Sequence, residues 1–187
     1  MADTPEHHRQ RSEFIRRLVQ RSAGRLPVTF PVAEGQLPLT YNHKPTGRGD
    51  DYLDLTGQPL FPFGFGLSYT TFEYSDLRIE PAEISANDTV TVRFNVRNSG
   101  ARAGDEVVQL YVRDLLTSVA RPLMELKGFA RVGLAPGEVK ELTFRLSREH
   151  LKMLDREMKW VVEPGRFRLM IGGSSKDIRL RGEFGVR

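Results

Sequence analysis

The chain has 187 residues, of which 39% are hydrophobic, 9% aromatic and 28% charged. This length suits one domain with a flanking segment and is too short for a catalytic (β/α)8 barrel, which needs about 250 residues. Because cysteine is absent, a disulfide framework, a thiolate zinc site and a cysteine nucleophile are excluded. No apolar run approaches the ~20 residues that span a bilayer and no signal peptide begins the chain, so we expect no membrane partner and, as written, a cytoplasmic protein.

The positive charge is concentrated at the N-terminus. Residues 1–25 hold six arginines against three acidic residues, whereas the rest of the chain holds 22 basic and 21 acidic residues. A folded part with a net charge of +1 has no basic field to neutralise a phosphate backbone. The pattern therefore indicates no nucleic-acid partner.

The first segment of the chain is polar and then amphipathic. Residues 1–11 lack periodicity and are expected to form a disordered lead. Ser12 can cap a short helix over residues 13–20, on which Phe14, Ile15, Leu18 and Val19 share one face. A helix of this length is marginal alone, so we expect that face to pack against something.

Residues 24–68 are rich in proline, glycine and aromatic residues, and they form only short extended pieces by pattern. A loop-rich stretch of this length far exceeds the ~12–15 residues usual inside a compact domain. Glycines alternate with Phe61, Phe63 and Phe65 and let the backbone pass close to aromatic rings. We expect this segment to wrap around its own domain or to belong to something larger.

From Thr70 onward, hydrophobic residues alternate with polar ones. The pattern is clearest at Val90, Val92, Phe94 and Val96. Further strands are predicted around 72–79, 107–112, 123–132, 142–146, 160–162, 167–171 and 178–180, with turns at 98–100, 134–137 and 164–165 and one helical turn within 147–154. Seven or eight short strands separated by turns predict an antiparallel β-sandwich of the immunoglobulin or fibronectin type III kind.

No catalytic or metal-binding constellation is visible in the sequence, and no cofactor is expected. Most acidic residues alternate with basic ones on strands or lie in turns, which predicts solvated faces. Asp50, Asp51 and Asp54 form the only local acidic cluster, and calcium needs more oxygen ligands than these supply. His43 and His150 are isolated, and no G-x-S-x-G nucleophile motif occurs.

Several long motifs, in order, resemble glycoside hydrolase family 3, the β-glucosidase and β-xylosidase family. GRLPVTFP at 24–31, GQLPLTYNHKPTGR at 35–48, YLD at 52–54 and PLFPFGFGLSYTTFEYS at 59–75 are similar to the end of that family's second domain. VRNSGARAGDEVVQLYV at 96–112, RPLMELKGFARVGLAPGE at 121–138 and WVVEPGRFRLMIGGSS at 160–175 are similar to its C-terminal fibronectin type III-like domain.

The resemblance implies a division into a lead at 1–11, a second-domain remnant and interdomain connector at 12–68, and a fibronectin type III-like sandwich at 69–187. The family's nucleophilic aspartate and acid/base glutamate belong to regions that have no counterpart here, so no residue inherits a catalytic role. The expected function is that of a non-catalytic accessory domain that supports a catalytic region. A loop of Tyr41, Asn42, His43, Lys44 and Arg48 is expected to border a sugar pocket or to connect domains.

The aromatic segment and the amphipathic helix form an expected docking surface, whose members are Phe14, Ile15, Leu18, Phe61, Phe63 and Phe65. Three outcomes are open: the segment folds back on its own sandwich, pairs with a second copy, or docks on a separate catalytic chain. Homodimerisation is favoured because it requires no other gene product. The rival function is a carbohydrate-binding module, which needs an exposed aromatic platform; Trp160, beside Val161 and Val162, is instead predicted to lie in the core.

Overall fold

The computed structural model describes residues 24–45 and 56–187. The predicted lead at 1–11, the predicted helix at 13–20 with Phe14, Ile15 and Leu18, the loop residue Arg48 and the acidic cluster at 50–54 lie outside the described residues. Within the described part, no helix is both long and apolar enough to cross a membrane.

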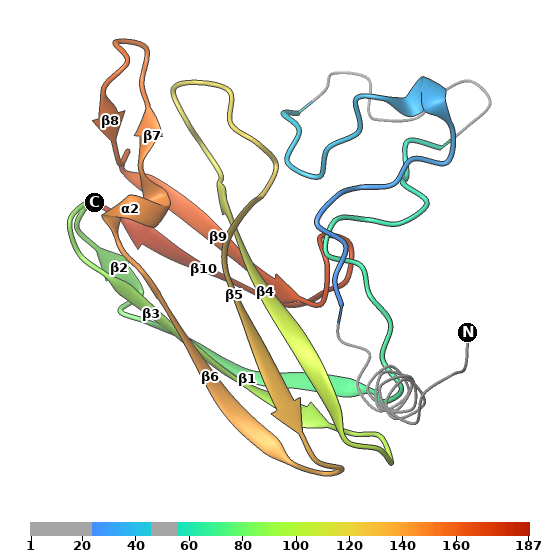
Figure 1. Ribbon diagram of the computed structural model, residues 1–187. Coiled ribbons are helices and arrows are strands. Elements are labelled where there is room, and N and C mark those ends of the chain that lie inside the picture. The colour runs from blue at the N-terminus through green and yellow to red at the C-terminus, as the bar shows by residue number, and fades with distance from the viewer. Residues whose placement is uncertain (1–23, 46–55) are drawn as a thin grey trace, which may run out of the picture.

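Two sheets pack face to face and form the predicted sandwich (Figure 1). A three-stranded antiparallel sheet has the order β1-β3-β6, with β1 at Phe72–Glu80, β3 at Val90–Asn98 and β6 at Val139–Leu146. A five-stranded sheet has the order β2-β10-β9-β4-β5, with β2 at Glu83–Ile84, β4 at Gly104–Asp114, β5 at Glu125–Leu134, β9 at Gly165–Gly172 and β10 at Ile178–Val186.

Alternation along the strands produces the core between the sheets. Val90, Val92, Phe94 and Val96 are all buried on the inner face of β3. The inward-facing residues of β4 in the other sheet belong to the same core, and they are Val108, Leu110 and Val112. Burial of these side chains is the main favourable contribution to folding, at roughly 1.5–3 kcal/mol for each large apolar side chain. The prediction of a two-sheet sandwich is confirmed.

Strand β2 was not predicted. It pairs in parallel with the end of β10, where Glu83 faces Gly185 and Ile84 faces Val186. Two residues carry no readable alternation, so no sequence pattern marks this strand. Its role is to place the buried Ile84 in the core.

A small hairpin extends from one end of the sandwich and belongs to neither sheet (Figure 1). It consists of β7 at Met153–Leu154 and β8 at Trp160–Val161, preceded by the predicted helical turn, α2 at Arg148–Leu151. Trp160 is 54% exposed, and Lys152 Nζ lies 4.8 Å from the centre of its ring. The prediction that Trp160 lies in the core is therefore wrong, because Trp160 belongs to a protruding hairpin, and the chain returns to the core only at Val162.

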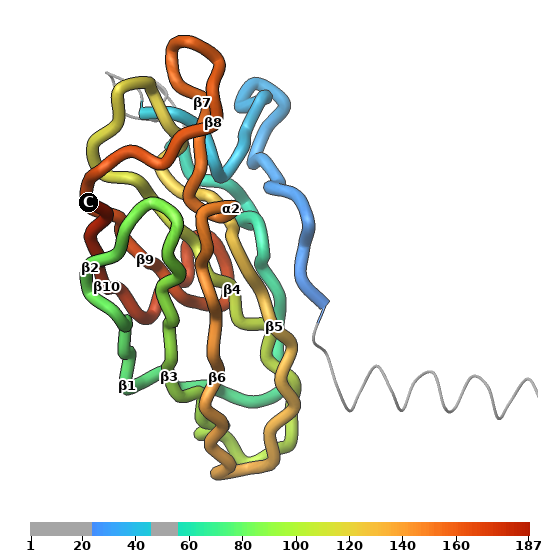
Figure 2. The backbone as a smooth tube through the Cα atoms, turned by 90° about the vertical axis from the view of Figure 1, so that its left-hand side faces the viewer, coloured from blue at the N-terminus to red at the C-terminus, as the bar shows by residue number. Residues whose placement is uncertain are grey.

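Residues 24–45 and 56–68, hereafter the connector, contain one short 3-10 helix, η1 at Glu34–Gln36, and one isolated β-bridge between Phe30 and Phe61. Gln36 is buried and ties the two connector pieces together: its side-chain amide donates to the carbonyl oxygens of Thr56 and Gln58. Both views show the connector running beside the five-stranded sheet near β4 (Figures 1 and 2).

Candidate functional site: the anchored connector

Glu106 lies at the junction of the connector and the sandwich. Alternate residues of a strand face the same side of the sheet, so the side chain of Glu106 points between the sheets like those of Val108 and Leu110 on β4. It is only 2% exposed. The prediction of solvated carboxylates is wrong for this residue. The signal that could have revealed it is its position in the inward register of a strand whose other inward residues are apolar.

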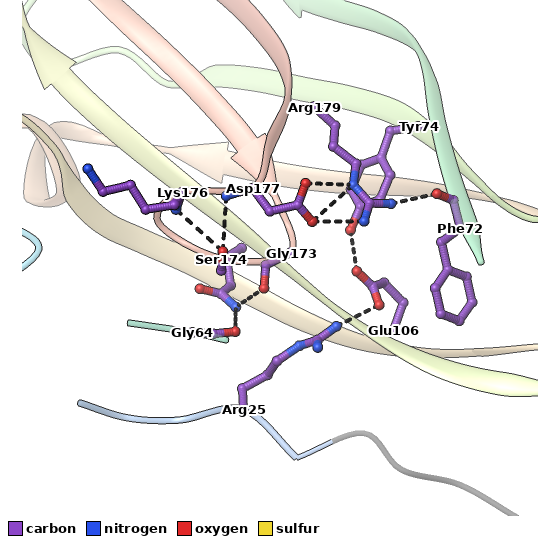
Figure 3. Close-up of polar contacts among 11 residues, drawn as sticks. Arg25, Gly64, Phe72, Tyr74, Glu106, Gly173, Ser174, Lys176, Asp177 and Arg179 are labelled. Atoms are coloured by element: carbon purple, nitrogen blue, oxygen red, sulfur yellow. Dashed lines mark hydrogen bonds and ion pairs between the residues drawn. The ribbon is translucent and has the colours of Figure 1, made fainter. Parts of the chain in front are cut away.

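Both carboxylate oxygens of Glu106 are hydrogen-bonded (Figure 3). Arg25 of the connector donates from Nη2 to Oε2 at 2.6 Å, and the hydroxyl of Tyr74 on β1 donates to Oε1 at 2.7 Å. One buried carboxylate thus joins three parts of the chain: the connector, the three-stranded sheet and the five-stranded sheet. A buried charge with both oxygens satisfied avoids the desolvation penalty of an unpaired one.

Arg179 of β10 closes this cluster from the other side. Its guanidinium lies 4.9 Å from the centre of the Tyr74 ring, and its Nη1 donates to the carbonyl oxygen of Phe72 at 2.5 Å. Nη2 is paired with Asp177 at 2.8 Å. Burial, followed by the negative charge of Glu106, raises the pKa of Tyr74 well above its usual range, so its hydroxyl remains a hydrogen-bond donor.

A groove of about 670 Å³ opens beside the cluster and is bordered by residues that include Arg25, Phe65, Thr70, Tyr74 and Arg179. Both carboxylate oxygens of Glu106 already accept hydrogen bonds from within the chain. In the described part of the chain, no three histidine, aspartate or glutamate side chains gather as metal ligands. The arrangement is suited to holding segments together.

A second anchor is formed by Gln109, also on β4 but facing outward. Its Nε2 donates to the carbonyl oxygens of Gly64 at 3.2 Å and Gly173 at 2.7 Å, and its Oε1 accepts a hydrogen bond from the hydroxyl of Tyr111. Gly64 has a φ of 79°, and a Cβ there would lie 2.1 Å from Gln109 Oε1. Only glycine therefore lets the connector backbone lie this close to the sheet.

Tyr41 is packed on the sheet rather than presented to solvent. It stacks on Phe63 with 4.2 Å between ring centres and meets the edge of Tyr111 at 5.8 Å. Its hydroxyl accepts a hydrogen bond from the backbone N–H of Leu126 at 3.3 Å.

Of the other predicted loop residues in the described part of the chain, one packs on the sandwich and two are exposed. His43 is partly buried, and its carbonyl oxygen accepts a hydrogen bond from Leu123 N at 3.0 Å, whereas Asn42 and Lys44 are exposed. The structure therefore brings Tyr41 and His43 against the sandwich and leaves Asn42 and Lys44 facing outward.

The three phenylalanines of the predicted docking surface have different environments. Phe63 is partly buried against Tyr41, and its carbonyl oxygen accepts a hydrogen bond from Ser175 N at 3.0 Å. Phe61 is 38% exposed and contacts Phe30 edge-on, with 6.3 Å between ring centres, and Phe65 at 5.0 Å. The connector therefore has residues fixed to the sandwich and others that are exposed, and its exposed large apolar side chains are together called its outer face.

That outer face contains large hydrophobic side chains that remain exposed in this chain. Its members are Val28, Phe30, Val32, Leu37, Leu60, Phe61 and Leu67. Of the three outcomes expected for the segment, folding back on its own sandwich is the one seen in the described residues. Pairing with a second copy stays a prediction, since the outer face is uncovered.

Three comparisons identify the relatives of this arrangement. Residues 106–175 match the fibronectin type III-like domain family. Together with the relatives below, this match makes the chain similar to the fibronectin type III-like region of family 3 glycoside hydrolases. The predicted resemblance is thereby confirmed.

A β-xylosidase of Formosa agariphila is 48% identical over 157 residues, which are 82% of this chain and 22% of that protein. A periplasmic β-glucosidase of Salmonella typhimurium is 39% identical over 172 residues, which are 87% of this chain and 22% of that protein. The solved structure of a β-glucosidase from Erythrobacter marinus superimposes with a TM-score of 0.84 at 44% identity, over 88% of this chain and 22% of that one.

The chain therefore spans about a fifth of the length of these relatives, and within it residues 106–175 match the fibronectin type III-like domain. It is not the catalytic part of a family 3 enzyme. It is similar to an accessory domain of such enzymes.

Proposed function

We propose that this chain packs against the catalytic region of a family 3 glycosidase and stabilises it. The observation that carries the proposal is the apolar outer face of a connector that is itself fixed to the sandwich. Soluble monomers rarely expose contiguous apolar patches larger than a few hundred Å², and larger ones mark docking surfaces. The connector carries seven of the thirteen exposed large hydrophobic residues in the described part of the chain, although it is much shorter than the sandwich.

The anchors of the connector favour docking because they fix its shape beforehand. Arg25 is bonded to Glu106, Gly64 to Gln109, and Tyr41 lies between Phe63 and Tyr111. A surface already ordered in the free chain loses little conformational entropy when a partner covers it. The sandwich then acts as a rigid support, and the connector as the contact surface.

The loop from Tyr41 to Lys44 has a more specific place in this proposal. Tyr41 and His43 hold the loop on the sheet, while Asn42 and Lys44 point outward as hydrogen-bond donors. We propose that this loop borders the sugar pocket of the catalytic region, and its resemblance to the family supports this place. Its exposed amide and ammonium groups are suited to contact sugar hydroxyls there.

A trans-complementation experiment tests the proposal. The probe is the Erythrobacter marinus β-glucosidase shortened by the region that this chain matches, mixed with the intact chain. We expect binding in the micromolar range or tighter and slower thermal inactivation of the shortened enzyme. The matched variants are Phe61→Ser, on the connector, and Val139→Ser, an exposed residue of β6; only the first should weaken binding. Absence of binding by the unmodified chain would contradict the proposal.

The exposure of Trp160 favours a second candidate function, in which the hairpin offers an aromatic platform to a sugar ring. Lys152 lies over one face of the indole, and Arg148 Nη2 donates to the backbone carbonyl oxygen of Trp160 at 3.0 Å, so the backbone of β8 is tied to α2. Trp160 is the only tryptophan, so its fluorescence reports binding directly. Titration with cellulose, xylan and soluble glucosides should change the emission if this function holds, and Trp160→Ala should lose retention on the polymer.

A further inference from the structure

Phe129 is a large apolar side chain on the outer face of the sandwich. It lies in the middle of β5 and is 68% exposed. In the antiparallel pairing of β4 and β5 its Cα partner is Gln109, whose side chain faces outward under the connector. Because residues directly opposite each other share a face of the sheet, Phe129 also points outward, next to the connector.

Phe129 lies beside the connector, and Gln109 is the residue between them. Gln109 is bonded to Gly64, the neighbour of Phe65, and the ring centres of Phe65 and Phe61 lie 5.0 Å apart. Phe61 in turn contacts Phe30. Phe129 thus lies on the sheet face to which the connector is fixed, beside the surface proposed above to meet the catalytic region, but it belongs to the sandwich itself.

The charges beside Phe129 are neutralised within the chain. Lys127 Nζ lies 3.5 Å from Glu125 Oε1, and Arg131 Nη2 lies 2.6 Å from Asp105 Oδ2. A partner that covers Phe129 therefore meets an apolar ring flanked by compensated ion pairs. Such a surface suits an uncharged, apolar hollow rather than an acidic or basic one.

We propose that Phe129 is an anchor residue of the docking interface, inserted into an apolar hollow of the catalytic region. The inference rests on the proposed function and adds the outer face of β5 to the interface. The occupant is taken to be the catalytic region because Phe129 shares its sheet face with the anchored connector, and because the relatives carry most of their length outside the matched 22%. Buried aromatic anchors of this kind supply much of the affinity of protein interfaces.

The test compares Phe129→Ser with Val139→Ser, two substitutions at exposed strand positions of different sheets. The probe is the shortened Erythrobacter marinus β-glucosidase, and calorimetry gives the dissociation constants. We expect Phe129→Ser to weaken binding at least tenfold and Val139→Ser to change it less than twofold. Urea unfolding of each variant checks the fold, and Phe129→Thr, which keeps a high strand propensity, serves as the second variant.

The outcomes separate the two proposals. If the unmodified chain binds and Phe129→Ser and Phe129→Thr bind equally well, the anchor role is overturned while the proposed function stands. If the unmodified chain does not bind, both proposals are overturned. Sedimentation velocity of the chain alone provides the last arm: self-association that Phe129→Ser abolishes would assign this surface to a second copy and overturn the catalytic region as occupant.

Discussion

Arg25 of the connector and Glu106 of β4 form a largely buried ion pair, with 2.6 Å between Nη2 and Oε2. The two residues are 81 positions apart in the chain, and the pair fixes the connector to the inner edge of the sandwich. Tyr74 holds the other oxygen of the same carboxylate. The connector is thus part of the folded unit, and its outer face has a defined shape.

Loss of the Glu106 charge should release the connector. In Glu106→Gln the guanidinium of Arg25 stays largely buried without its counter-ion, so the free energy of unfolding should fall by about 2 kcal/mol. Urea unfolding measures this loss. In hydrogen exchange, the amides of Leu26 and Gly64 should become less protected, while those of the core strand β3 should not.

The control for this prediction is Glu183→Gln. Glu183 is paired with Arg168 at 2.9 Å, but both side chains are partly exposed, unlike the buried carboxylate of Glu106. Exposed pairs contribute about 0–1 kcal/mol, so the control should change stability little. Equal losses in the two variants would show that the junction has no special role.

Replacing Gly64 should disturb the second anchor. Gly64→Ala places a Cβ against the buried side chain of Gln109 in a backbone conformation with φ of 79°. The left-handed conformation alone costs about 1–2 kcal/mol for a residue with a side chain, and the contact adds to it. Urea unfolding should therefore show a loss of about 2–3 kcal/mol.

Gly137→Ala separates the two causes. Gly137 has a φ of 75°, but no atom lies within 4 Å of the position its Cβ would take. This variant should show the conformational cost of about 1 kcal/mol alone. Equal decreases in the free energy of unfolding for the two alanine variants would contradict a close contact between Gly64 and Gln109.

Asp114, at the end of β4, should make stability depend on pH. Burial raises its pKa to about 6, with Glu163 and Glu125 adding to the rise, against the lowering effects of a hydrogen bond to the Leu116 backbone and of Arg121. The folded chain keeps this proton up to about pH 6, whereas the unfolded chain loses it near its ordinary value of 3.8. The free energy of unfolding should therefore decrease as pH rises from about 4 to about 6 and then level off.

Asp114→Asn should remove this dependence. Because the side chain is half exposed, the expected gain at pH 7 is about 1 kcal/mol, well below what a full two-unit pKa difference implies. Thermal unfolding at pH 4, 5, 6 and 7 measures the effect, with Glu141→Gln, an exposed residue of β6, as control. A pH profile of Asp114→Asn identical to that of the unmodified chain would contradict the prediction.

The buried tyrosines predict behaviour at alkaline pH. Burial is the largest cause that raises the pKa of both Tyr74 and Tyr111 above the ordinary value of 10.0. A phenol that resists ionisation in the folded state makes stability fall above pH 10, by up to about 1.4 kcal/mol per pH unit for each such group. Tyr74→Phe should make this fall shallower in urea unfolding between pH 9 and 11, and an unchanged slope would contradict the assignment.

The sandwich was predictable because one face of each sheet is buried, and period-two alternation records this directly. Val90, Val92, Phe94 and Val96 were assigned correctly for that reason. Trp160 was misplaced because a two-residue strand has too little alternation to distinguish core from hairpin. Alternation of hydrophobic and polar residues distinguishes buried from exposed positions only where the strand is long enough to show it.

The anchors were harder to predict because their partners are distant in sequence. Glu106 and Gln109 are polar residues in a strand, and their burial depends on Arg25 and Gly64 of the connector. A partial signal existed: Val107 and Tyr111 make the second face of β4 apolar, which indicates that something covers it. The sequence does not show that the cover is the chain's own segment.

Hydrogen exchange of the chain with and without the shortened Erythrobacter marinus β-glucosidase tests the docking surface most directly. Binding should slow exchange in residues 26–33, 58–67 and 128–131, which carry Phe30, Phe61 and Phe129. Exchange in β1 and β6 should not change. Protection confined to the three-stranded sheet, or no protection at all, would contradict the assignment of the connector and β5 as the surface that meets the catalytic region.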